Sequence, residues 1–206
     1  MLAEKIDKYL LSRKRDERSI HCFHPSSLHK PARDLYYHYL HGDEPVYDPR
    51  ILRVFDNGHC VHSRLQDYLQ RAGVLKAIEV LVENREYEIK GHADGIIEMN
   101  ELQGVLEIKS MNSNQFYSAC APKPEHLIQV NIYMFCLGIT RACILYECKD
   151  DQQLKEFFVK QDSRILNPVL KKIKYVQQCI QDKKPPAIEQ KSLAIVSRKR
   201  VINTVS

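Results

Sequence analysis

The chain has 206 residues, of which 44% are apolar and 28% are charged, with 9 prolines and 7 glycines. This composition excludes collagen-like, low-complexity and mostly disordered chains, and the length predicts a single domain over residues 1–206. A net charge of +5 is compatible with a polyanionic partner but does not require one. No apolar run approaches the roughly 20 residues that cross a bilayer. The first residues alternate charged and apolar side chains, so we expect neither a membrane span nor a secretory signal.

The seven cysteines are an odd number, and no two of them form a CxxC pair. We therefore expect neither a disulfide framework nor a structural zinc site. Free thiols are typical of a reducing compartment, which predicts a cytoplasmic protein.

The N-terminal third of the chain is predicted to be helical. Residues 1–20 begin with a helical pattern, which the charged run 13–18 ends in a loop. Ser26 or Ser27 fits the N-cap of a second helix, although Pro31 restricts where its first turn can lie. The apolar residues assigned to this helix are Leu28, Leu35, Tyr36, Tyr39 and Leu40.

A third helix is predicted from Ile51 to Leu69, where apolar residues recur at helical spacing. The pattern then changes to short segments rich in β-branched residues, which predict three or four strands joined by hairpins, with one turn at 100–104. The strand segments are 78–82, 87–89, 93–99 and 104–109.

Helix and strand alternate in the rest of the chain. A helix from about Pro124 to Gly138 precedes strands at 142–148 and 154–159, and a last helix runs from about Ser163 to Asp182. The core is expected over about 25–185, with a basic tail at 187–206. This order of elements predicts the α/β class, with a mixed sheet flanked by helices.

The predicted strands carry the residues with the clearest chemical meaning. Asp94 lies between Gly91 and Gly95, while Glu107 and Lys109 are two residues apart and so share one face of a strand. The predicted hairpin would bring Asp94 beside Glu107. Two carboxylates and an ammonium are costly to desolvate unless compensated, and Mg²⁺ or Mn²⁺ suits such oxygen ligands better than zinc. The alternative for Glu107 and Lys109 is a solvated strand face.

Two helical segments add polar side chains before and after these strands. His62 lies in the third predicted helix, and Gln129 and Tyr133 are four residues apart on one face of a later helix. Alone, His62 fits a partly buried hydrogen-bonded side chain, and the pair fits ordinary amphipathic polarity.

In this order, His62, the G-x-x-D motif at 91–94, the E-x-K motif at 107–109 and the Q-x-x-x-Y motif at 129–133 resemble the PD-(D/E)XK nuclease superfamily, specifically its RecB-type branch. The resemblance covers about 25–185 and includes segments similar to CRISPR-associated and phage members. It implies a restriction-endonuclease-like mixed central sheet flanked by helices. Iron–sulfur members carry a cysteine in the opening helix and a cysteine cluster near the C-terminus. Here only Cys179 lies near the end, so we predict no iron–sulfur cluster.

The resemblance also implies roles for single residues. Lys109 would position the attacking water, and Gln129 and Tyr133 would line the same cleft and contact the scissile phosphate or steady Lys109. The groups implied to hold one or two Mg²⁺ or Mn²⁺ ions are His62, Asp94, Glu107 and the main-chain carbonyl of Ile108. The implied DNA contacts are Ser26, Ser27, Arg33, Arg53 and Lys149.

The resemblance favours a metal-dependent exonuclease that acts on single-stranded DNA or duplex ends. A structure-selective or restriction-type endonuclease would use the same metal site, and a non-catalytic DNA-binding subunit would keep the same fold. A small cytosolic protein without a nucleic-acid role is a further alternative. No zinc finger or helix-turn-helix signature is present, so no sequence-specific base readout is predicted. The polarity of digestion, the choice of DNA over RNA, and a homo-oligomer or a recombination or repair protein as partner are left open.

Overall fold

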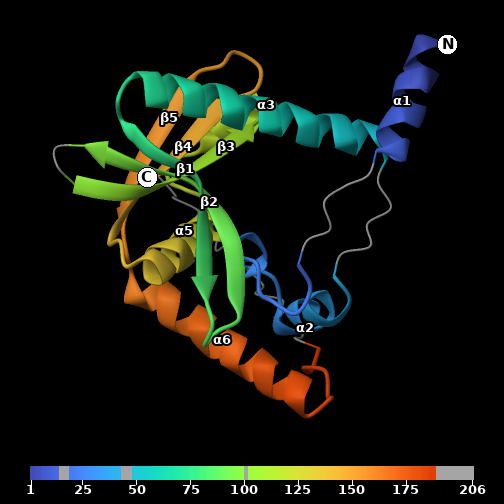
Figure 1. The fold of residues 1–206 in the computed structure, drawn as a ribbon, viewed down its shortest axis with the longest axis vertical. Coiled ribbons are helices and arrows are strands. Elements are labelled where there is room, and N and C mark those ends of the chain that lie inside the picture. The colour runs from blue at the N-terminus through green and yellow to red at the C-terminus, as the bar shows by residue number, and fades with distance from the viewer. Residues whose placement is uncertain (14–18, 43–47, 100–101, 189–206) are drawn as a thin grey trace, which may run out of the picture.

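The computed structural model describes residues 1–13, 19–42, 48–99 and 102–188 (Figure 1). In chain order its elements are α1 (Leu2–Ser12), the 3-10 turn η1 (Pro25–Ser27), α2 (Ala32–His41), α3 (Pro49–Arg71), β1 (Leu75–Asn84), β2 (Ile89–Met99), β3 (Leu102–Met111), α4 (Ser113–Ser118), α5 (Pro124–Leu137), β4 (Arg141–Cys148), β5 (Leu154–Lys160) and α6 (Ser163–Gln181). The predicted helices at 51–69, 124–138 and 163–182 are confirmed as α3, α5 and α6.

The five strands form one mixed sheet in the order β1-β2-β3-β4-β5. Strands β3 and β4 are parallel, and the other neighbouring pairs are antiparallel. A parallel pair needs a long crossover, which α4 and α5 supply between β3 and β4. The predicted mixed sheet with flanking helices is therefore confirmed.

Helices cover both faces of the sheet (Figure 1). On one face α3 packs Val61 and Leu65 against apolar side chains of β1 to β4. On the other face α5 packs Val130 and Met134 against β3 and β4. Helices α2 and α6 pack together in a third cluster beside α5. The sheet is thus buried between α3 and α5, and polar residues inside this sandwich stand out.

The segment around Ser26 and Ser27 differs from the prediction. Both serines belong to η1, and α2 begins only at Ala32, with Pro31 at its N-cap and no side-chain cap. A proline disfavours helical dihedrals in the residue before it, so a helix could not run through residue 30 into Pro31. The assignment of either serine as the N-cap, and of Leu28 to the helix, is therefore wrong.

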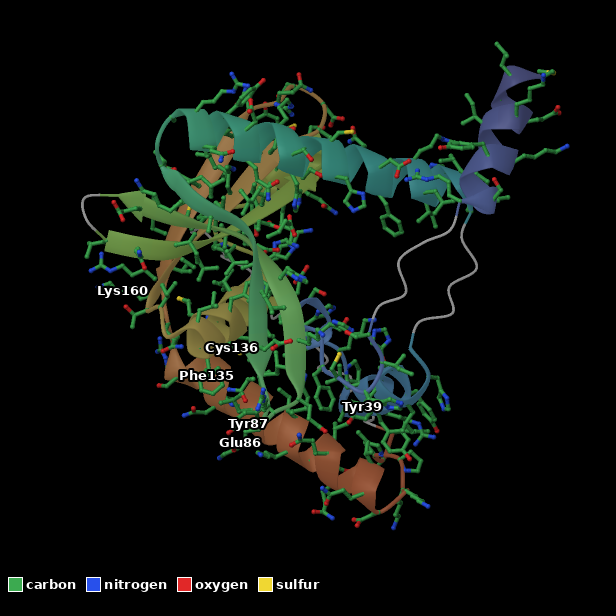
Figure 2. The ribbon with its side chains drawn as sticks, in the orientation of Figure 1. Tyr39, Glu86, Tyr87, Phe135, Cys136 and Lys160 are labelled. Carbon is green, nitrogen blue, oxygen red and sulfur yellow. The ribbon has the colours of Figure 1, made fainter. Side chains whose placement is uncertain are left out.

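The predicted strand at 87–89 is mostly a turn. Asn84 Oδ1 accepts the Tyr87 main-chain N–H, and Glu88 has a positive φ of 51°, so β2 starts only at Ile89. The Tyr87 ring meets Phe135 of α5 edge-on, with ring centroids 5.8 Å apart (Figure 2). Three strands, not four, precede the crossover, and this contact fixes the far end of their first hairpin.

Some predicted features fall wholly or partly outside the described residues. The hairpin between β2 and β3 is confirmed by the pairing of Met99 with Leu102, while residues 100 and 101 at its tip lie outside. Residues 14–18 of the charged run and 189–206 of the basic tail also lie outside. None of the described helices has the length and apolarity needed to cross a membrane.

Candidate active site

The candidate site lies where β2 separates from β3. The two strands pair from Met99 and Leu102 as far as Gly95 and Leu106. One residue further, the main-chain pairing ends and a side chain takes over. Asp94 Oδ2 accepts the main-chain N–H of Ile108 at 2.5 Å. Beyond this point β2 no longer pairs with β3; it continues beside β1 down to Ile89, which also forms an isolated parallel bridge with Phe23. The place where β2 separates from β3 is a fork in the sheet. Asp94 bridges this fork by its hydrogen bond, and the segment that carries Glu107 lies across the fork from it.

The glycines on either side of Asp94 allow β2 to lie close to β1 and to η1. A Cβ added at Gly95 would lie 2.6 Å from the carbonyl oxygen of Ala77 and 2.5 Å from the Leu75 side chain. A Cβ at Gly91 would lie 2.9 Å from Pro25 of η1. Only glycine fits contacts of this kind without local displacement.

Glu107 is a buried carboxylate with one unpartnered oxygen. Its side chain is 2% exposed; Oε1 pairs with Lys109 Nζ, and Oε2 has no hydrogen-bond partner among the described residues. Burial, and then the Asp94 carboxylate, raise the pKa of Glu107 to about 7. For Lys109 burial acts against the charge, but the Glu107 carboxylate outweighs it and raises the Lys109 pKa. The expected shared face of Glu107 and Lys109 is confirmed, and the solvated alternative is wrong for Glu107.

His62 reaches the same cluster from α3. Its Nδ1 lies 3.2 Å from Asp94 Oδ1, so the two carboxylate oxygens of Asp94 face α3 and β3 respectively. Burial alone would lower the pKa of His62, but the hydrogen bond and charge of Asp94 outweigh burial and raise it. The sequence motifs that carry His62, Asp94, Glu107 and Lys109 thus meet at one place.

Two further contacts hold α3 against the sheet at this place. Arg64 Nη2 donates to both oxygens of the buried Glu147 carboxylate of β4, at 2.8 and 2.7 Å. Gln66 Nε2 donates to the main-chain carbonyl of Asp94 at 2.9 Å. Sequence reasoning missed Gln66, although it lies one helical turn after His62 and therefore on the same face of α3.

Gln129 and Tyr133 are both buried, and Tyr133 contacts β2. The Tyr133 hydroxyl donates to the main-chain carbonyl of His92 at 2.7 Å, and Gln129 Nε2 donates to the Tyr133 hydroxyl at 2.8 Å. The pair anchors α5 to β2 two residues before Asp94. Their expected contact with a phosphate or with Lys109 stays a prediction.

The five implied DNA contacts lie on separate elements and differ in exposure. Ser26 is exposed and Ser27 is buried in η1. Arg33 donates to the carbonyl of Pro186 at 2.7 Å, and Arg53 of α3 forms an ion pair with Asp7 of α1. The remaining candidate, Lys149, directly follows β4 and is half-buried. Within the described part of the chain, no hydrogen bond or ion pair joins these five to Asp94 or Glu107, so their role in binding stays a prediction.

Solved structures of exonucleases share this arrangement of helices and strands. An alkaline exonuclease from Laribacter hongkongensis, LHK-Exo, has a TM-score of 0.61 at 16% identity, over 80% of this chain and 90% of that one. The same enzyme in complex with dAMP gives 0.61 at 17%, with the same coverage. A phage-related exonuclease from Haemophilus somnus 129PT gives 0.52 at 14%, over 81% and 98% of the two chains. The chain therefore shares the fold of these exonucleases, which are PD-(D/E)XK nucleases.

The resemblance of the sequence motifs to PD-(D/E)XK nucleases is thus confirmed at the level of the fold. No family model and no curated protein matches the sequence. At identities of 14–17% the similarity establishes the fold alone.

Mg²⁺ and Mn²⁺ prefer oxygen donors, and Glu107 Oε2 is a buried oxygen without a partner among the described residues. Among the described residues, no three His, Cys, Asp or Glu side chains are already spaced to enclose an ion. His62 is hydrogen-bonded to Asp94, so its role as a direct ligand stays a prediction. Mg²⁺ keeps several waters and uses only one or two carboxylates, so Asp94 and Glu107 fit such an ion.

Proposed function

We propose that this protein is a DNA nuclease that depends on Mg²⁺ or Mn²⁺, and specifically an exonuclease that acts on single strands or duplex ends. The observation that carries the proposal is the Glu107 carboxylate, buried beside Asp94 with one oxygen unpartnered. Lys109 pairs with the other oxygen of Glu107, but a single ammonium beside two carboxylates leaves negative charge that a divalent cation would compensate. The fold shared with two exonucleases supports the same reaction class, as an analogy between folds.

The residues that would hold one or two ions are Asp94, Glu107 and the main-chain carbonyl of Ile108, with His62 as a further ligand or as the group that orients Asp94. When bound, a divalent ion lowers the pKa of a water molecule and neutralises phosphate oxygens. We expect the protein to bind these ions and to hold no iron–sulfur cluster.

Lys109 has a definite role in this proposal. Because Glu107 raises its pKa, the Lys109 ammonium keeps its proton at neutral pH and cannot accept one from water. It therefore acts as a donor, which orients the attacking water or stabilises negative charge on the phosphate. The His62 ring fixes the Asp94 carboxylate by its contact of 3.2 Å.

The substrate is proposed from charge as well as from the fold. The chain holds 31 Lys and Arg residues against 26 Asp and Glu. Contacts to phosphates release counterions, so the affinity for DNA should fall steeply as salt is raised. We place the reaction in the cytoplasm, and leave open whether a second copy of the chain or a recombination or repair protein is a partner.

The test is a digestion series in Mg²⁺ and in Mn²⁺ on linear and circular DNA, single- and double-stranded, labelled at the 5′ or the 3′ end. We expect linear DNA to be degraded and a closed circular single strand to stay intact. Cleavage of the circle would show that the protein is an endonuclease and not an exonuclease. If no DNA is cut and millimolar Mg²⁺ or Mn²⁺ does not bind, a non-catalytic subunit is the better interpretation.

Variants of the site separate chemistry from stability. Lys109→Ala and Glu107→Ala should abolish cleavage while the fold, followed by circular dichroism, survives. Lys160→Ala is the matched control, because this exposed lysine lies at the end of β5 (Figure 2). If Lys109→Ala cuts at the wild-type rate, the role given to Lys109 is wrong.

A further inference from the structure

A histidine that the sequence motifs did not single out lies beside Lys109. His126 is on α5, one turn before Gln129, and its Nδ1 lies 2.8 Å from the Tyr146 hydroxyl. Tyr146 is the direct partner of Lys109 in the pairing of β3 with β4, so the two side chains are neighbours on one face of the sheet. The His126 ring packs edge-on against the Tyr146 ring, with centroids 5.5 Å apart. This edge-on contact places the imidazole on the α5 face of the sheet, where Lys109 and Glu107 also lie.

The hydrogen bonds around Tyr146 determine which ring nitrogen of His126 carries the proton. The main-chain N–H of Lys123 can only donate, and it donates to the Tyr146 hydroxyl oxygen at 2.9 Å. Tyr146 is fully buried, and within the described residues the only acceptor in reach of its proton is His126 Nδ1. If Nδ1 carried a proton instead, the phenol proton would be buried without a partner, which is costly. The ring is therefore protonated at Nε2.

His126 stays neutral at physiological pH. Burial and the Lys109 ammonium lower its pKa to about 4, with Lys123 and His29 acting in the same direction and Glu125 against it. Its place in the first turn of α5 adds to this effect, because the positive end of a helix disfavours a cation.

Nε2–H is the one polar group of His126 left over. In the described part of the chain no hydrogen bond engages it, although the ring is only half-buried and so open to a ligand. On this geometry we propose that His126 Nε2–H is a hydrogen-bond donor to an oxygen of the phosphate that the Lys109 site cleaves.

This inference rests on the proposed nuclease function and adds a substrate contact to it. A neutral donor suits a place beside an ammonium, since a second cation there would be repelled by Lys109. In a water-poor site, one donor aimed at developing charge is typically worth about 100- to 1,000-fold in rate. His126 would then stabilise charge on the phosphate throughout the reaction without transferring a proton.

The test compares two replacements of similar size. His126→Asn keeps a group near Nδ1 for the Tyr146 hydroxyl but has no donor at the position of Nε2, whereas the His126→Gln amide reaches that position. Cleavage of end-labelled linear DNA is measured under single-turnover conditions in Mn²⁺, and DNA affinity is measured in Ca²⁺. We expect His126→Asn to lower the rate about 100-fold and His126→Gln to stay within about 10-fold of wild type. His59→Asn, at an exposed position of α3, is the control and should leave the rate unchanged.

The pH profile distinguishes a neutral donor from an acid. Because His126 is neutral above pH 5, the ratio of the wild-type to the His126→Asn rate should be constant from pH 6 to pH 9. A ratio that falls as pH rises would mean that a protonated His126 acts, and would overturn the proposal. So would equal losses in His126→Asn and His126→Gln, or no loss in either.

If His126→Asn fails to fold, Tyr146→Phe provides the second variant. It removes the hydroxyl that fixes the tautomer and should lower the single-turnover rate about 10-fold, whereas an unchanged rate would contradict the inference. A wild-type protein that cuts no DNA in either metal overturns the proposed function and this inference together. Active wild type with inactive Lys109→Ala and unaffected His126→Asn overturns the inference alone.

Discussion

Asp94 and Ile108 are joined by a hydrogen bond from a main-chain N–H to a carboxylate, at the point where the strand ladder between β2 and β3 ends. The same carboxylate accepts from His62 of α3 through its other oxygen. Asp94 therefore has a structural task, to close the fork in the sheet, in addition to any chemical one. Its loss should be felt in stability as well as in activity, and the two effects can be separated.

Asp94→Asn and Asp94→Ala should differ in stability and agree in activity. The asparagine carbonyl still accepts the Ile108 N–H, whereas alanine leaves this buried donor unpaired, at a cost of about 1–3 kcal/mol. Both remove the charge proposed to hold an ion, so both should be inactive. Urea unfolding measures the difference in stability. Equal free energies of unfolding for the two variants would contradict the structural role of the carboxylate.

The metal-free protein should lose stability as pH rises from 5 to 8. The pKa of Glu107 is about 7 in the folded chain against 4.5 as its ordinary value, so folding favours the protonated form. This contribution is complete below pH 4.5 and is lost as pH rises through 7. The raised pKa of His62 acts in the same direction, because its contribution is present below 6.5 and lost above its folded value. Glu107 alone should account for on the order of 3 kcal/mol.

Thermal melts in EDTA between pH 5 and pH 8 measure this dependence. In Glu107→Gln, which cannot ionise, the slope should be smaller than in the wild-type protein. An equal slope in both proteins would show that folding does not raise the pKa of Glu107.

Gly95→Ala should destabilise the fold beside Asp94, in contrast to Gly58→Ala. The added methyl would overlap the Ala77 carbonyl, which belongs to the backbone of β1 and cannot rotate away. Overpacking of this kind costs about 1–3 kcal/mol. At Gly58, inside α3, an added Cβ has nothing within 4 Å, so alanine should stabilise the helix by about 0.5–1 kcal/mol. Chemical unfolding of the two variants tests the opposite signs, and a destabilised Gly58→Ala with a neutral Gly95→Ala would refute the account.

The core of the candidate site could be predicted from the sequence because it depends on local periodicity. A strand repeats every two residues, which puts Glu107 and Lys109 on one face, and a short hairpin brings Asp94 opposite Glu107. The shared face and the nearness of Asp94 to Glu107 follow from those two facts, whereas the fork between β2 and β3 does not.

Other features could not be predicted, because they depend on how elements pack. Gln66 and the Arg64–Glu147 ion pair join α3 to the sheet. No sequence pattern indicates which polar residue of a helix contacts a strand. His126 likewise becomes informative only through Tyr146, 20 residues away. Helix α4 was missed because its six residues, capped by Asn112, are too few to show a helical period.

Tyr133→Phe should destabilise the protein more than an exposed Tyr→Phe change does. The Tyr133 hydroxyl donates to the His92 carbonyl and accepts from Gln129, so its removal leaves the buried Gln129 amide and the part-buried His92 carbonyl without this partner. The expected cost is about 1–3 kcal/mol. Tyr9→Phe is the matched control, since Tyr9 lies on the exposed side of α1 and its replacement should change stability by less than about 0.5 kcal/mol.

Because the His92 carbonyl lies two residues before Asp94, stabilisation of the protein by Mn²⁺ should also weaken in Tyr133→Phe. Unfolding in urea with and without Mn²⁺ measures both effects, and a Tyr133→Phe protein as stable as Tyr9→Phe would show that this anchor of β2 to α5 is not needed.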